Sequence, residues 1–107
     1  MVVAHESWPY FARRFGLTVV AALEPTPGVP PSAAYLATLI DRMKASRVPL
    51  IIAEPSTSAS LIAQVTARAG ARAVILIPSV GGDPAARDYL SLFDVNVARL
   101  AAALAAR

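Results

Sequence analysis

Four short apolar runs alternate with longer segments in which apolar residues recur every three or four positions. The runs are Val2–Ala4, Thr18–Leu23, Pro49–Ala53 and Ala73–Ile77. Short β-branched runs predict buried strands, and the periodic segments predict amphipathic helices. Continuous apolar strands separated by helices are typical of a parallel sheet covered on both faces. The order therefore predicts an α/β fold, a small doubly wound four-stranded parallel sheet with helices on both faces and right-handed crossovers.

Proline, glycine, serine and aspartate mark the ends of the predicted helices. The N-terminal markers are Pro9, Ser32, Ser58 or Ser60, and Asp83 followed by Pro84; the C-terminal glycines are Gly16 and Gly70. Serine and aspartate side chains accept hydrogen bonds from free N–H groups of a first turn, and proline suits that turn. Glycine adopts the left-handed conformation that ends many helices. Asp83 and Pro84 predict a helix from Pro84 to near the C-terminus.

The chain is more apolar than a small soluble domain requires. Its 107 residues fit one domain, residues 1–107, and 56% of them are hydrophobic, against about 45–50% in typical soluble domains. A membrane-spanning helix needs about 20 nearly uninterrupted apolar residues, and the runs here are far shorter. The excess therefore predicts a face that something outside the chain covers.

Charge and cysteine content exclude several classes of function. The net charge is +3, and the basic residues are spread along the predicted helices without forming a run. This pattern is typical of solvated helix faces, so no nucleic-acid partner is expected. The absence of cysteine excludes disulfides and thiolate ligands. Residues 1–5 have neither the basic segment nor the cleavage site of a signal peptide, so none is expected.

The residues that follow the predicted strands are the candidates for binding, because ligands of such sheets sit beyond the carboxyl ends of the strands. They are His5, Glu6 and Ser7, then Glu24, then Glu54 and Ser56, then Ser79, Gly81, Gly82 and Asp83. His5 predicts a metal ligand suited to zinc; a histidine satisfied by a local hydrogen bond is the alternative. One histidine without cysteine cannot close a tetrahedral site, so the other ligands must come from another chain or domain.

The other candidates have structural alternatives. Glu54 is either a ligand or a structural partner, of Arg47 or of a helix N-terminus. Glu24 lies in a proline-rich segment, where a solvated carboxylate is favoured. The loop Gly81–Asp83 offers backbone donors for an anion, which gives the alternative function, a small α/β nucleotide- or anion-binding module or enzyme. It lacks the lysine and the spacing of a phosphate loop, and the chain has no nucleophile elbow.

Several stretches together resemble one protein family. Residues 2–17, VVAHESWPYFARRFGL, resemble the segment that opens the C-terminal lobe of the zinc- and manganese-binding solute-binding proteins of ABC importers. The similarity continues through LEPTPGVPPS at 23–32, IIAEP at 51–55, and DYL at 88–90 with Asn96 and Leu100. It covers nearly the whole chain, in order.

The resemblance implies a non-enzymatic protein of two lobes, of which this chain is the C-terminal one. Metal would sit between the lobes on two ligands from each and pass to an ABC permease, in a periplasmic or extracellular setting. His5 matches the third ligand, and histidine there favours zinc over manganese. The missing N-terminal lobe would be the main partner, with a homodimer or domain swap for the isolated chain, which would bind zinc or manganese weakly or not at all.

The chain departs from the family at one ligand. The family usually has an aspartate just after the fourth strand, where this chain reads LIPSV at 76–80. The fourth ligand is then water, or Asp83 or Glu54 takes its place.

Overall fold

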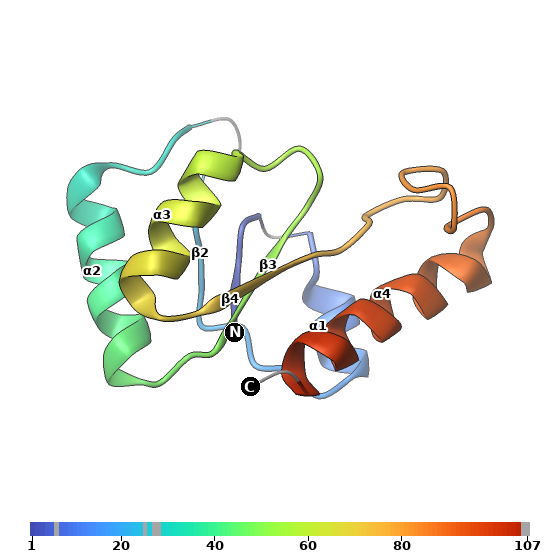
Figure 1. The fold of residues 1–107 in the computed structure, drawn as a ribbon, viewed down its shortest axis with the longest axis horizontal. Helices are drawn as coiled ribbons and strands as arrows, with labels where there is room; N and C mark the ends of the chain where they lie inside the picture. Colours follow the sequence, from blue (N-terminus) through green and yellow to red (C-terminus); the bar gives the residue numbers. More distant parts are fainter. Residues whose placement is uncertain (6, 25, 27–28, 106–107) are drawn as a thin grey trace.

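A computed structural model of the chain describes residues 1–5, 7–24, 26 and 29–105, in which strands and helices alternate (Figure 1). The strands are β1 (Val2–Val3), β2 (Ala21–Ala22), β3 (Leu50–Ala53) and β4 (Arg72–Ile75). The helices are α1 (Pro9–Arg14), α2 (Ala33–Ala45), α3 (Ala59–Ala69) and α4 (Tyr89–Ala105). All strand pairs are parallel. The predicted α/β fold with a four-stranded parallel sheet is confirmed.

The sheet order β2-β1-β3-β4 creates a switch point between β1 and β3. The chain passes from β1 to the edge strand β2 and then returns across β1 to β3. Connections that leave neighbouring strands in opposite directions leave a crevice at their carboxyl ends, which is where ligands bind in such sheets. A ligand site is therefore expected at the segments that follow β1 and β3.

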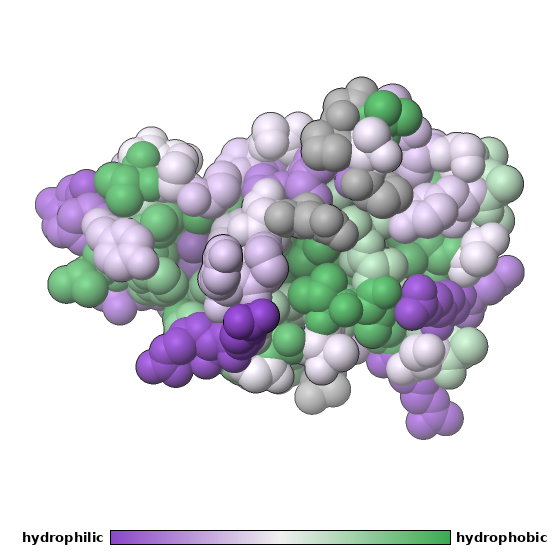
Figure 2. Space-filling model, turned by 180° about the vertical axis from the view of Figure 1, so that it is seen from behind, coloured by the Kyte–Doolittle hydropathy of each residue, from purple (hydrophilic) through white to green (hydrophobic). Residues whose placement is uncertain are grey.

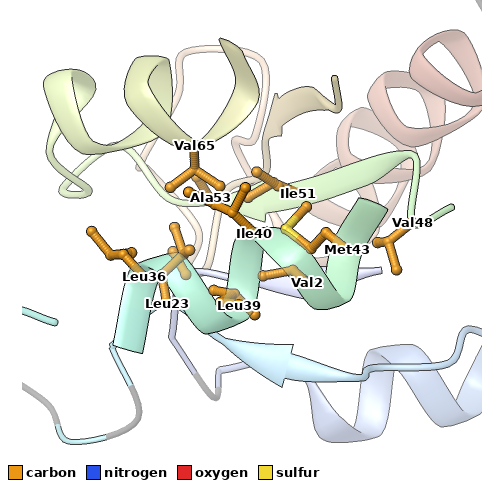
Figure 3. Packing of buried hydrophobic residues seen from close by; sticks show 11 residues of the cluster. Val2, Leu23, Leu36, Leu39, Ile40, Met43, Val48, Ile51, Ala53 and Val65 are labelled. Carbon is orange, nitrogen blue, oxygen red and sulfur yellow. The ribbon is translucent and has the colours of Figure 1, made fainter. Parts of the chain in front are cut away.

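Helices cover both faces of the sheet, as predicted. Helices α2 and α3 lie on one face, and α1 and α4 lie on the other (Figure 1). Successive strand residues alternate between the faces: Val2 and Ile51 contact the α2–α3 side (Figure 3), and Val3 and Ile52 contact the α1–α4 side. Within the described part of the chain, no helix has both the length and the apolarity needed to cross a membrane.

The helix caps match the sequence with one exception. Ser32 caps α2 and Ser58 caps α3, and Gly70 ends α3 in the left-handed conformation. The predicted start of the last helix at Pro84 is wrong, because α4 begins at Tyr89.

The reason is that Asp83 forms a turn, whereas Asp88 caps the helix. The Asp83 side chain accepts from the Ala85 N–H at 2.8 Å and its carbonyl accepts from the Ala86 N–H at 2.9 Å, which closes a turn. Asp88 instead accepts from both the backbone N–H and the hydroxyl of Ser91, each at 2.8 Å, and so caps α4.

Candidate metal site

The strand register brings the first candidate residues to one level. Val3 pairs with Ala22 of β2 and with Ile52 of β3. Two residues further along the three strands lie His5, Glu24 and Glu54. The ladder continues past the strands, since the Ala4 N–H donates to the Ile52 carbonyl at 2.7 Å and the Glu24 N–H donates to the Ala4 carbonyl at 3.0 Å. The three side chains thus meet at the carboxyl edge, around the switch point.

The His5 imidazole lies between the two carboxylates. Its Nδ1 is 2.8 Å from Glu54 Oε2, and its Nε2 is 3.0 Å from Glu24 Oε1. Ionised carboxylates only accept hydrogen bonds, so this arrangement favours a ring that donates from both nitrogens, which is the imidazolium form. The pKa of His5 is accordingly raised, chiefly by the hydrogen bond to Glu54 and further by Glu24, against the opposing effect of desolvation.

Glu54 is the fixed member of the cluster. Its side chain is 4% exposed, against 25% for His5 and 18% for Glu24. Its second oxygen accepts from the Trp8 indole N–H at 2.9 Å. Its backbone N–H donates to the Thr57 hydroxyl at 3.1 Å, and its carbonyl accepts from the Thr57 N–H at 2.9 Å. Glu54 therefore binds His5 and Trp8, not the partners that the sequence alternative named, and it holds the orientation of the imidazole.

Asp83 has other hydrogen-bond partners than the residues of this cluster. Its carboxylate binds Arg99 Nη2 at 2.8 Å, and Arg99 also donates to the Ile75 carbonyl at 3.1 Å. The pKa of Asp83 is lowered, first by the hydrogen bond from the Ala85 N–H and then by that from Arg99. Asp83 thus ties the loop after β4 to α4. Glu6, which also follows β1, lies outside the described residues.

The backbone N–H groups of Gly81 and Gly82 donate hydrogen bonds within their own loop. The Gly81 N–H donates to the Ala86 carbonyl at 2.8 Å, and the Gly82 N–H donates to the Ser79 carbonyl at 3.2 Å. An anion-binding loop needs such N–H groups free. The geometry therefore gives no support to the alternative nucleotide- or anion-binding function at this loop.

The cluster fits part of a metal site. Among the described residues, no three histidine, aspartate or glutamate side chains are arranged to hold one metal ion. Glu54 and Glu24 lie at different nitrogens of the same ring, so a single ion at either nitrogen meets only one of them. Imidazole nitrogen and carboxylate oxygen are nevertheless ligands that zinc and manganese accept. Further ligands must come from outside this cluster.

The chain is an α/β protein whose polar cluster lies at the switch point of a parallel sheet. Residues 1–103 match the model of the family described as zinc-uptake complex component A, periplasmic (ZnuA). The chain belongs to this family of solute-binding proteins, which confirms the resemblance seen in the sequence. No curated protein has a significant sequence match to it.

Three solved structures illustrate the similarity. FpvC from Pseudomonas aeruginosa, in complex with Mn²⁺, is 28% identical with a TM-score of 0.79, and the match covers 95% of this chain and 38% of that one. The laminin-binding protein Lbp of Streptococcus pyogenes is 25% identical with a TM-score of 0.75, covering 94% and 39%. A ZnuA structure is 25% identical with a TM-score of 0.69, covering 96% and 36%. The chain thus spans less than two fifths of these proteins.

Glu24 is the site residue that sequence reasoning undervalued. Its proline-rich surroundings favour a solvated side chain, yet its carboxylate is bonded to His5. The signal that would have found it is register, because Glu24 and His5 occupy equivalent positions after adjacent parallel strands.

Proposed function

We propose that the chain captures a divalent metal for ABC-type import, as the C-terminal lobe of a two-lobed solute-binding protein. Family membership supports the transport role, and the coverage of less than two fifths of the matched structures supports the lobe assignment. The observation that carries the proposal is His5, oriented and partly exposed at the switch point of the sheet.

His5 Nε2 is the proposed metal-binding atom. The buried Glu54 holds Nδ1, as carboxylates commonly do behind a metal-binding histidine. Metal replaces the Nε2 proton, so affinity should rise with pH. Histidine in this place favours zinc over manganese. FpvC has been solved with Mn²⁺ and with Ni²⁺, so titrations that compare Zn²⁺ with Mn²⁺ decide the metal.

The proposed partners follow from the incomplete site. A second, N-terminal lobe supplies the remaining ligands, and an ABC permease receives the metal in a periplasmic or extracellular setting; no catalytic role is proposed. The N-terminal lobe would cover this chain at the exposed apolar side chains of α1 and α4. Isolated chains are expected to self-associate there, as a homodimer or a domain swap.

Calorimetric titration with Zn²⁺ tests the proposal. The isolated chain should bind weakly, and His5→Ala should abolish that binding because it removes the nitrogen ligand. Asp41→Asn, a change at an exposed position of α2, is the control. Equal zinc affinity in wild type and His5→Ala would refute the assignment of His5.

A further inference from the structure

Among the described residues, the β4 side of the sheet offers no acidic ligand at the level of His5. Ala53 pairs with Ile75, so Leu76 lies level with Glu54, and Leu76 is fully buried. The next residue, Ile77, is also buried, and Asn96 bonds both its N–H and its carbonyl at 2.8 Å. The β4 exit is therefore apolar and fixed, and the nearest acid in the loop beyond it, Asp83, is bound to Arg99.

The opposite neighbour of β1 does supply a carboxylate. Glu24 follows β2, and its Oε1 is 3.0 Å from His5 Nε2, the nitrogen that Glu54 leaves available. Its position is fixed by its own N–H, bonded to the Ala4 carbonyl, and by Tyr35, whose hydroxyl donates to the Ala22 carbonyl at 2.6 Å. At 18% exposure the side chain is sheltered but reachable from solvent.

The contact between Nε2 and Glu24 brings a nitrogen and a carboxylate oxygen within reach of one ion. Zinc binds imidazole nitrogen and carboxylate oxygen at about 2.0–2.2 Å each, so His5 and Glu24 would hold one ion together once the carboxylate makes room for it. An ion on Nε2 would therefore require the Glu24 carboxylate to swing outward from the hydrogen-bonded position, which its partly exposed side chain allows. Glu54, at Nδ1, would keep its hydrogen bond throughout.

We propose that Glu24 is the second metal ligand that this chain supplies, beside His5 Nε2. The inference rests on the proposed function and deepens it, because it moves the acidic ligand from the β4 side of the sheet to the β2 side. A carboxylate oxygen beside the imidazole suits manganese better than a second nitrogen would. Glu24 is then the residue through which this lobe tunes the choice between zinc and manganese.

A comparison of Glu24→Gln and Glu54→Gln tests the inference in the full chain. Glutamine keeps the length of the side chain and removes the carboxylate charge, so loss of a ligand should affect the two metals unequally and loss of ring orientation should affect them alike. Zn²⁺ and Mn²⁺ affinities are measured by calorimetry, and Zn²⁺ binding is also followed by imidazole ¹⁵N resonances, which are unambiguous because the chain has one histidine.

The two variants should differ in kind. Glu24→Gln should weaken Mn²⁺ binding by at least about tenfold and Zn²⁺ binding by less, since the harder ion depends more on the carboxylate. Glu54→Gln should weaken both ions alike, by about 10–100-fold, because it changes only the orientation of the ring. In every variant that binds Zn²⁺, the Nε2 resonance should shift more than that of Nδ1.

Each other outcome has a distinct meaning. If Glu24→Gln matches the Asp41→Asn control while His5→Ala abolishes binding, Glu24 is no ligand and the proposed function stands. Equal weakening of both ions by Glu24→Gln would also overturn the inference, because it indicates an orienting role. Absence of binding by the wild-type chain at millimolar metal would overturn it too, since two oriented ligands should give measurable affinity. Unchanged binding in His5→Ala would instead remove the proposed function.

Discussion

The helix layers on the two faces of the sheet differ in how far they bury their apolar side chains. On the α2–α3 face, Ile40, Met43 and Val65 are at most 2% exposed, and the large apolar side chains of both helices are at least partly buried. On the α1–α4 side, Tyr10, Tyr89 and Leu90 are 82%, 67% and 75% exposed. In Figure 2 apolar patches alternate with hydrophilic side chains over the surface seen from behind. Both helix layers bury the strands beneath them, but only the α1–α4 layer leaves large apolar side chains of its own exposed. The α2–α3 layer is therefore the closed face, and the α1–α4 layer is the unfinished face.

The unfinished face is also the one that carries the candidate site. Between α1 and α4 lies an open groove of about 600 Å³. Trp8 lines this groove and donates its indole N–H to Glu54, so the groove and the His5 cluster share a wall. Apolar surface therefore lies directly beside the polar cluster of His5, Glu24 and Glu54.

Ile40→Ala should cost about 2–5 kcal/mol of the free energy of unfolding, because the cavity forms in the closed face where neighbours cannot relax. Leu90→Ala, on the unfinished side, should change stability by no more than about 0.5 kcal/mol. Urea unfolding followed by circular dichroism measures both. Similar losses in the two variants would mean that the faces do not differ as described.

Asn96→Ala should cost about 1–3 kcal/mol, because it leaves the buried N–H and carbonyl of Ile77 without their side-chain partner. The control is Thr38→Ala, which removes an exposed hydrogen bond on α2 and should change little. Urea unfolding gives the stabilities, and amide hydrogen exchange at Ile77 should accelerate in Asn96→Ala alone. Unchanged exchange there would show that α4 does not depend on Asn96 to hold the β4 exit.

The sequence predicts the features that depend on neighbouring residues, and it does not predict those that depend on contacts between distant segments. Strand runs, helix stripes and serine caps depend on neighbouring residues, so the fold and the edge position of His5 follow from local pattern. The contact between His5 and Glu24 depends on register between segments 19 positions apart, and no local pattern reports it. The start of α4 was missed for a related reason, since two aspartates each offer a cap and the tertiary contact with Arg99 holds the first one in a turn.

The pH dependence of stability should report the His5 cluster. The folded pKa of His5 is raised above its ordinary value of 6.5, mainly by the hydrogen bond to Glu54. The folded state therefore binds the proton more tightly, and the stabilisation is fully present below pH 6.5 and lost as pH rises through the folded pKa. Urea unfolding of wild type and His5→Asn at a series of pH values measures this loss.

The Met1 amino group gives an effect of opposite sign. Burial lowers its pKa from 8.0, so its contribution to stability grows as pH rises toward that value. The difference between the wild-type and His5→Asn profiles cancels this contribution. A difference that stays constant from about pH 5.5 to about pH 9 would contradict the imidazolium between two carboxylates.

Leu90→Ser should give the smallest change in stability, within about 0.5 kcal/mol, and yet a visible change in association. Leu90 is three-quarters exposed in the first turn of α4, so its removal costs the folded monomer little apolar burial. If isolated chains self-associate through the α1–α4 side, the apparent mass from light scattering should rise with concentration in wild type and less steeply in Leu90→Ser. Ala34→Ser, at an exposed position of α2 on the closed face, should behave as wild type. A wild-type chain that stays monomeric at high concentration would show that this apolar surface is insufficient for pairing between copies. The partner of the unfinished face would then be a different protein or domain.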